Sequence, residues 1–182
     1  MVRKKKSLQV QNKDVQFNQC LDFELQLASN IDISDAELIF FAVLCHHHYF
    51  IMCLNFKKKV VQVLDNNTLG KGVNFVSRYE NCDQILVEAF KNYCKFKGIK
   101  TLLNKMTKNE DGDDVFKHEL VKMYWKNPSN VTDCGIYCMR HMETFKGIGP
   151  NWDFGFNRTT ADDLFLTSLR AKYAVDIIFR NE

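Results

Sequence analysis

The chain has 182 residues, of which 46% are hydrophobic, with eight glycines and two prolines. This composition favours a compact globular protein and excludes disorder over most of the length. Its 25 lysines and arginines face 22 acidic residues, too small an excess to indicate a nucleic-acid partner. No apolar run approaches the roughly 20 residues of a membrane span. We therefore expect a soluble monomer that binds neither membrane nor nucleic acid.

Seven cysteines are scattered along the chain: Cys20, Cys45, Cys53, Cys82, Cys94, Cys134 and Cys138. Their number is odd, and no apolar signal-peptide core follows the first methionine. They are interpreted as reduced thiols of an intracellular protein, nuclear or cytoplasmic.

The first residues are polar and charged. Residues 1–14 are expected to be a poorly ordered lead-in, followed by a single domain over residues 15–182. The basic cluster Arg3–Lys6 is compatible with a nuclear localisation signal, a phosphate-binding arm or a solvated terminus. From Val15 to Leu27 apolar and mostly polar residues alternate, which predicts a strand.

Three apolar runs then predict a group of strands. Leu38–Leu44 and Tyr49–Phe56 are nearly continuous apolar segments, as in strands that are buried on both faces. Lys57–Lys59 forms a charged break before the third run, Val60–Leu64. A three-residue break between two strands predicts a hairpin.

The rest of the chain predicts helices and one further strand. Apolar residues recur at helical spacing over Glu80–Phe96, which predicts a helix that ends near Gly98. Lys105–Asp114 is interpreted as a surface loop and Glu119–Trp125 as the last strand. Thr160–Asp163 has the spacing of a capping box before a C-terminal helix. This order of elements predicts a mixed α+β domain.

Cys134 lies at the predicted start of another helix. Asp133, directly before it, is a good N-cap residue whose carboxylate accepts hydrogen bonds from the first turn. Ile136 and Met139 recur at helical spacing, so this helix is expected to bury one face. At the positive end of the helix dipole a thiolate is favoured over a thiol. The same position is also compatible with a packed core cysteine.

A thiol nucleophile needs a base and a third group that orients the base. The predicted hairpin supplies both, because His48 opens one strand and Asp65 follows the end of its neighbour. We therefore expect His48 and Asp65 to lie side by side, facing the helix that begins at Cys134. His118 and His141 are interpreted as structural, and Cys138 as a core residue.

A metal site is the alternative for the histidine cluster. Cys45, His46–His48 and Cys53 are residue types that bind zinc. However, neighbours on a strand point to opposite faces, and no C-x-x-C or H-x-x-x-H pair completes a tetrahedral set. The sequence therefore predicts no metal ligands.

Several segments together resemble a known family. Phe40–Asn66 contains His48-Tyr49-Phe50-Ile51 and Val63-Leu64-Asp65-Asn66, and Asp133–Tyr137 reads Asp-Cys-Gly-Ile-Tyr. These segments resemble the histidine, aspartate and nucleophile motifs of the ubiquitin-like-protein-specific (SUMO-deconjugating) cysteine proteases. Met139–Phe145 and Leu169–Ala174 look most like plant members, many of them carried by transposable elements.

The resemblance implies a papain-like α+β fold, in which a central mixed sheet faces a nucleophile at a helix N-terminus. It implies that Cys134 is the nucleophile, His48 the general base and Asp65 the orienting partner. The implied reaction is cleavage after the C-terminal glycine of a ubiquitin-like, SUMO-type modifier or of its conjugates. It implies no metal and no organic cofactor.

Two positions depart from the family pattern. The family usually places tryptophan after the catalytic histidine, and this chain has Tyr49. The family also carries an oxyanion glutamine shortly before the cysteine, whereas Trp125–Asn130 contains none. Asn127 or the backbone N–H of Cys134 is the candidate donor in its place. This departure favours an alternative function, a catalytically weakened or inactive domain that binds a ubiquitin-like modifier or serves a mobile-element protein.

Overall fold

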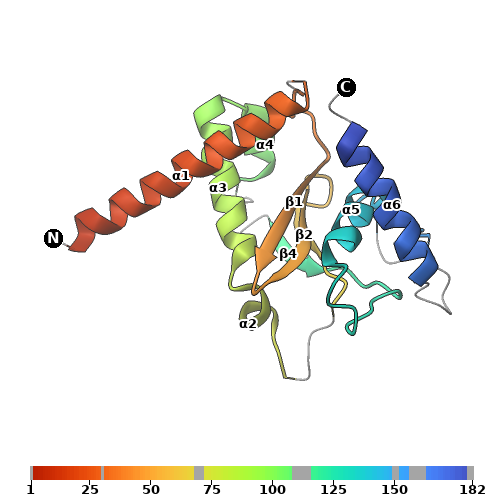
Figure 1. Cartoon of the computed structure of the whole chain (residues 1–182). Helices are drawn as coiled ribbons and strands as arrows, with labels where there is room; N and C mark the ends of the chain where they lie inside the picture. Colours follow the sequence, from red (N-terminus) through yellow and green to blue (C-terminus); the bar gives the residue numbers. More distant parts are fainter. Residues whose placement is uncertain are drawn as a thin grey trace. The chain divides into compact units, whose positions relative to one another are not determined.

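The computed structural model describes residues 2–29, 31–67, 72–107, 116–148, 152–155 and 163–179. Within these ranges the elements follow in the order α1, β1, β2, β3, α2, α3, α4, β4, α5 and α6 (Figure 1). The predicted mixed α+β class is confirmed, and the sheet is mixed. By packing, the chain divides into two compact units. One unit comprises Met1–Glu37 with Asn81–Phe116, and the other comprises Leu38–Glu80 with Lys117–Glu182.

The first unit is helical and contains α1 (Val2–Leu27), α3 (Cys82–Lys97) and α4 (Lys100–Lys105). The helix predicted over residues 80–96 is confirmed as α3, which ends at Gly98 in the left-handed conformation with φ 71°. Polar contacts join α1 to α3: the Tyr93 hydroxyl donates to Asp22 at 2.9 Å, and the Lys97 ammonium lies 2.8 Å from the same carboxylate.

The strand prediction for Val15–Leu27 was wrong. A single helix, α1, spans these residues and also covers residues 2–14, where the sequence predicted no element. The segment contains no glycine or proline and is rich in lysine, glutamine and leucine, which are good helix formers. Its apolar residues also fit helical spacing, since Phe17, Leu21 and Leu25 follow one another at four-residue intervals.

The second unit is built on a four-stranded sheet in the order β1-β2-β3-β4. β1 (Leu38–Cys45), β2 (His48–Asn55) and β3 (Val60–Leu64) pair antiparallel, and β4 (Lys117–Leu120) runs parallel to β3. The predicted hairpin through residues 57–59 is thereby confirmed.

Two details of the sheet differ from the prediction. β1 is at the end of the strand order and is only partly buried, whereas the sequence predicted burial on both faces. The last strand covers Lys117–Leu120 instead of Glu119–Trp125, because the chain leaves the sheet after Val121 donates to Val63. Residues 121–133 then form an irregular segment that leads to α5.

Helices α5 (Cys134–Thr144) and α6 (Asp163–Phe179) lie on one side of the sheet, with α5 between the strands and α6 (Figure 1). α5 buries Tyr137, Cys138 and His141. The core here joins both strands and helices, and its members include Ile51, Leu64, Trp125, Tyr137, Cys138, Phe145, Trp152, Phe154 and Leu166. The core thus fixes α5 against β2 and β3. The predicted capping box of α6 lies outside the described residues, as does most of the predicted loop over residues 105–114.

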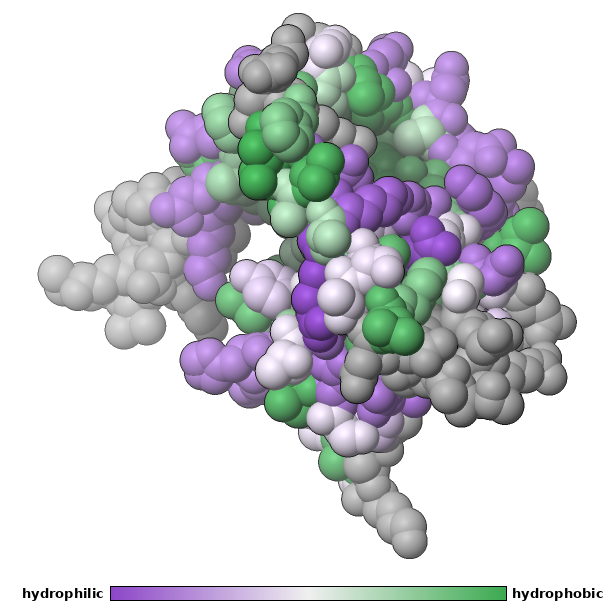
Figure 2. Space-filling view, turned by 45° about the vertical axis from the view of Figure 1, so that its right-hand side comes forward, coloured by the Kyte–Doolittle hydropathy of each residue, from purple (hydrophilic) through white to green (hydrophobic). Residues whose placement is uncertain are grey.

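Apolar side chains that remain at the surface are spread over several elements, for example Val15 on α1, Phe96 on α3 and Ile177 on α6. Figure 2 shows apolar residues on one face as separate green groups between hydrophilic ones. Among the described helices, none is both long and apolar enough to cross a membrane.

Candidate active site

His48 and Asp65 meet at one end of the β2–β3 hairpin. His48 is the first residue of β2, and Asp65 directly follows β3, whose Leu64 pairs with Ile51. His48 Nε2 lies 2.6 Å from Asp65 Oδ1. The imidazole is 16% exposed and the carboxylate only 1%. The structure therefore brings together the two residues that the hairpin was predicted to juxtapose.

The Asp65 carboxylate has further partners that the sequence did not reveal. The Tyr79 hydroxyl donates to Oδ2 at 3.0 Å, and the Asn67 backbone N–H donates to Oδ1 at 2.8 Å. The Arg78 guanidinium lies 3.8 Å from Oδ2. Burial alone would raise the pKa of this carboxyl, but the hydrogen bonds, led by that from His48, lower the pKa below its ordinary value. Asp65 is therefore a fixed negative charge.

Tyr79 and Arg78 come from α2 (Phe75–Tyr79), a five-residue helix. Asn74 caps it, accepting from the Ser77 N–H at 2.8 Å. Burial first, and then the Asp65 charge, raises the pKa of Tyr79, so its hydroxyl stays protonated and continues to donate. The Asn-x-x-Ser pattern at Asn74 could have predicted the start of this helix. Nothing in the sequence indicates that the end of α2 contacts Asp65.

Cys134 is the first residue of α5 and is half-buried. The helix start is where the sequence predicted it, but Asp133 does not cap the helix with its side chain. Its carboxylate accepts instead from Arg170 Nε at 2.8 Å and Nη2 at 2.7 Å, and from Asn130 Nδ2 at 2.8 Å. The hydrogen bonds from Arg170 lower the pKa of Asp133, against the opposing effect of burial. Asp133 thus occupies the N-cap position as predicted, but its side chain does not cap the helix, because a guanidinium on α6 competes for this carboxylate.

The segment before α5 is joined to the end of β3. The Asn66 side chain donates to the Asn127 carbonyl and accepts from the Asn127 N–H, both at 3.1 Å. The Lys126 ammonium donates to the Asn67 carbonyl at 3.3 Å. The residues after β3 and the residues before Cys134 are therefore held as one structure.

Cys138, one turn after Cys134, packs in the same core as Ile51 of β2 and Leu64 of β3, the strands that carry the His48–Asp65 dyad. Burial mainly, with smaller contributions from the charges of Cys134 and Asp65, raises the pKa of the Cys138 thiol to about 12. Its side chain is buried in the core, which confirms the interpretation of Cys138 as a core residue. The core packing therefore holds the first turns of α5 against the hairpin strands that carry His48 and Asp65.

Asn127, the candidate oxyanion donor, has a constrained backbone and side chain. Its backbone N–H and carbonyl are both used by Asn66. Its side-chain Oδ1 accepts from the Ser129 hydroxyl at 2.8 Å. The Nδ2 amide is therefore the group that Asn127 offers as a donor.

The remaining histidines separate into packed and surface groups. His141 is 1% exposed, packed between Trp152 and Phe154, and burial lowers its pKa to about 3. His118 stacks on Phe75, with ring centroids 3.8 Å apart. Both fit the structural roles that were predicted for them.

The residues weighed as an alternative zinc site, Cys45, His46–His48 and Cys53, are not gathered as one set. His48 bonds Asp65, and Cys53 is buried in the core, where burial raises its pKa to about 12. Among the described residues, one group of His, Cys and carboxylate side chains is close enough to hold a metal ion: Cys45, His46 and Glu80.

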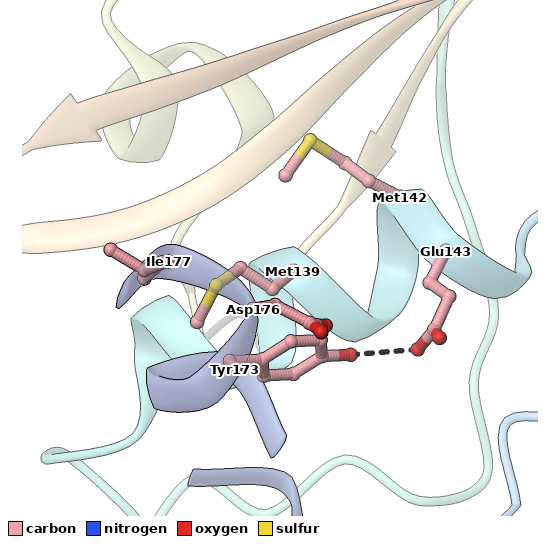
Figure 3. Close-up of a pocket in the computed structure, with 6 residues that line it drawn as sticks. All are labelled: Met139, Met142, Glu143, Tyr173, Asp176 and Ile177. Atoms are coloured by element: carbon pink, nitrogen blue, oxygen red, sulfur yellow. Dashed lines mark hydrogen bonds between the residues drawn. The ribbon is translucent and has the colours of Figure 1, made fainter. Parts of the chain in front are cut away.

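A groove of about 380 Å³ lies between α5 and α6, lined by Met139, Met142, Glu143, Tyr173, Asp176 and Ile177. Figure 3 shows the Tyr173 hydroxyl directed at Glu143 across the two helices, a hydrogen bond of 2.9 Å. The four candidate site residues are not among its lining residues, so the groove is separate from the dyad.

Comparison with known proteins identifies no relative. No protein-family model, no curated protein and no solved structure matches the chain.

Proposed function

We propose that this chain is a cysteine peptidase or isopeptidase that cleaves after the C-terminal glycine of a ubiquitin-like, SUMO-type modifier. The observation that carries the proposal is the 2.6 Å contact between His48 and the buried Asp65, on a hairpin that shares its core with the helix that begins at Cys134. A charged, anchored carboxylate behind an imidazole is the arrangement that orients a general base.

The geometry assigns a role to each ring nitrogen. Because Asp65 engages Nε2, Nδ1 is the atom that takes the thiol proton. The Cys134 thiolate attacks the carbonyl carbon, and His48 returns the proton to the leaving amine. A thioester remains on Cys134, and water, deprotonated by His48, releases the modifier.

Oxyanion stabilisation is assigned to two donors. The backbone N–H of Cys134 lies in the first turn of α5, where such groups have no acceptor within the helix. Asn127 Nδ2, on the segment tied to Asn66, is the second donor. In this proposal the two donors replace the family's glutamine, and one donor of this kind is worth roughly 10²–10³ in rate.

Gly135 supports an extended substrate. A Cβ added at Gly135 would meet no atom within 4 Å, so packing in the described chain does not require glycine beside the nucleophile. In this proposal the glycine leaves room for the substrate backbone. The modifier class itself rests on the resemblance of the motifs around His48, Asp65 and Cys134, and a nuclear or cytoplasmic location follows from that class.

The test is turnover of a SUMO-type modifier carrying a reporter amide on its C-terminal glycine. We expect release of the reporter by the purified chain and none by Cys134→Ala, with Cys20→Ser as the matched control because Cys20 is exposed and lies on α1. Release that survives Cys134→Ala would contradict the proposal.

A second candidate function is a domain that binds the modifier without cleaving it. The absence of glutamine from Trp125–Asn130 favours it. Its signature is saturable binding of the modifier, unchanged by Cys134→Ala, together with no reporter release. Multiple turnovers lost on that substitution would exclude it.

A further inference from the structure

Three metal-ligating side chains meet at the turn between β1 and β2. Cys45 ends β1, His46 begins the turn, and Glu80 directly follows α2. One ligand atom from each lies within 4.8 Å of the other two, and His46 Nε2 is 2.8 Å from Glu80 Oε1. Cys45 is half-buried, whereas His46 and Glu80 are 58% and 60% exposed, so an ion can reach all three from solvent.

The backbone explains how adjacent residues converge. Cys45 pairs with His48, so His46 and His47 form a two-residue turn with φ of 49° and 60°. Such turns favour Asn-Gly, and histidine is among the non-glycine residues that tolerate positive φ. Side chains alternate between the two faces of the sheet only as far as Cys45, where β1 ends. His46 lies in the turn, so its side chain is not held on the face opposite Cys45.

Glu80 is also held in the left-handed conformation, with φ 49°, as the C-cap of α2. Its backbone N–H bonds the Val76 carbonyl at 2.8 Å, which fixes where its side chain begins. Two of the three clustered residues thus occupy backbone conformations that non-glycine residues adopt at a cost of roughly 1–2 kcal/mol. Left-handed residues are common in two-residue hairpin turns and at helix ends, so these conformations fix where the two side chains begin.

We propose that Cys45, His46 and Glu80 form a surface site for Zn²⁺ or a similar divalent transition metal. Thiolate, imidazole and carboxylate are the protein ligands of zinc, at about 2.0–2.3 Å from the ion. Tetrahedral ligands at these lengths lie about 3.5 Å apart, so His46 and Glu80 separate slightly from their 2.8 Å contact to admit the ion, with the Cys45 sulfur within 4.8 Å of both. Three protein ligands leave a fourth position for water. Binding replaces the S–H bond of Cys45 by a sulfur–metal bond and releases the proton to solvent.

The site borders the dyad without sharing a ligand with it. Cys45 pairs with His48 in the sheet, and Glu80 follows Tyr79, which donates to Asp65. Metal binding is expected to fix the hairpin turn and the end of α2 on either side of the dyad. The proposal nevertheless stands independently of catalysis, because none of its three ligands takes part in the proposed reaction.

The test is titration of the full chain with Co²⁺, a spectroscopic substitute for Zn²⁺, in a Cys134→Ser background so that the proposed nucleophile supplies no thiolate. We expect one ion per chain, with a thiolate-to-cobalt charge-transfer band in the near ultraviolet that Zn²⁺ abolishes. The band should disappear in Cys45→Ser and persist in Cys20→Ser, the control at an exposed cysteine.

Two further variants test the other ligands while preserving the fold. His46→Asn retains a residue that tolerates positive φ, and Glu80→Gln keeps the shape of the side chain. Each should weaken Co²⁺ binding by at least about tenfold, because even partners that only orient a ligand are worth 10–100-fold. No charge-transfer band, or a band of equal strength in Cys45→Ser, would overturn the proposal.

Discussion

Asp65 is the most constrained side chain of the candidate site. Its two oxygens accept from His48, Tyr79 and the Asn67 backbone, and the residue is 1% exposed. A carboxylate held this way fixes the imidazole in one orientation. The proposed chemistry at Cys134 therefore depends on a residue that is nearly inaccessible to substrate.

Asp65→Asn should lower turnover by about 10²–10⁴, the range that general acid–base catalysis contributes. The amide is isosteric but removes the negative charge beside the imidazole. Tyr79→Phe removes one donor to the carboxylate and leaves its charge, so it should lower turnover much less. Reporter release measured on both variants, with circular dichroism to check folding, compares the two. Equal turnover in Asp65→Asn and the unmodified chain would contradict the role of Asp65.

Gly135→Ala separates stability from catalysis. Gly135 lies in the first turn of α5, and an added Cβ meets no atom within 4 Å. Alanine is the better helix former by up to about 1 kcal/mol, so thermal unfolding should show unchanged or slightly higher stability. Reporter release should fall, because the methyl group enters the proposed path of the substrate. Unchanged turnover would show that no chain passes over Gly135.

The sequence predicted that His48 and Asp65 lie together, but not the other side chains that hold the carboxylates of the site. The proximity of His48 and Asp65 could be predicted because strand pairing in a hairpin with a short turn brings its ends together. The sequence did not indicate the roles of Tyr79, Arg78 and Arg170. These side chains contact Asp65 or Asp133 from helices whose positions depend on tertiary packing. Asp133 illustrates the limit: its local preference for capping is overridden by Arg170, 37 positions away.

The start of α5 is held by α6 through a pair of charges. Arg170 on α6 donates twice to Asp133, which is 5% exposed and directly precedes Cys134. A second link, between Glu143 on α5 and Lys172 and Tyr173 on α6, lies nearer the surface. The two helices therefore form one support for the proposed nucleophile.

Arg170→Ala should lower the free energy of unfolding by about 2 kcal/mol, the usual contribution of hydrogen bonds to a charged group. The loss is expected because the variant leaves a largely buried carboxylate with fewer partners. Lys172→Ala is the matched control on the same helix; its partly exposed ion pair should contribute no more than about 1 kcal/mol. Urea denaturation measures both. Equal losses in the two variants would contradict a special role for the Asp133–Arg170 pair.

The strands of the hairpin and the helices α3 and α5 could be predicted from the spacing of their apolar residues and from the residues that interrupt or end each element. α1 could not, because the apolar residues over Val15–Leu27 fit both alternation and four-residue spacing. None of the described side chains of α1 is fully buried, and helix propensity summed over a segment this long favours the helix. The sequence also did not indicate that β4 ends at Leu120, because the length of β4 depends on how far β3 extends beside it.

His141 gives the whole molecule a pH dependence. Both its ring nitrogens are buried, with no hydrogen-bond partner among the described residues. Burial mainly lowers its pKa from 6.5 to about 3. Between these values the unfolded chain binds a proton at His141 that the folded chain does not. The contribution to stability is therefore complete above about pH 6.5 and is lost as the pH falls towards 3.

Urea denaturation at a series of pH values should show this loss, with a slope of up to about 1.4 kcal/mol per pH unit from this one residue. His141→Leu should flatten the profile in that window, whereas His47→Asn, at an exposed histidine in a turn, should not. Identical profiles for His141→Leu and the unmodified chain would show that His141 titrates alike in both states.

In the proposed function Cys134 is a nucleophile activated by His48 and Asp65. Covalent capture by a SUMO-type modifier that carries an electrophile at its C-terminus tests this role, with the adduct located by mass spectrometry. We expect one adduct per chain, on Cys134, formed more slowly by on the order of 10² or more in His48→Ala, with the exposed Cys20 unmodified. No adduct on Cys134, or modification of Cys20 at the same rate, would contradict this role.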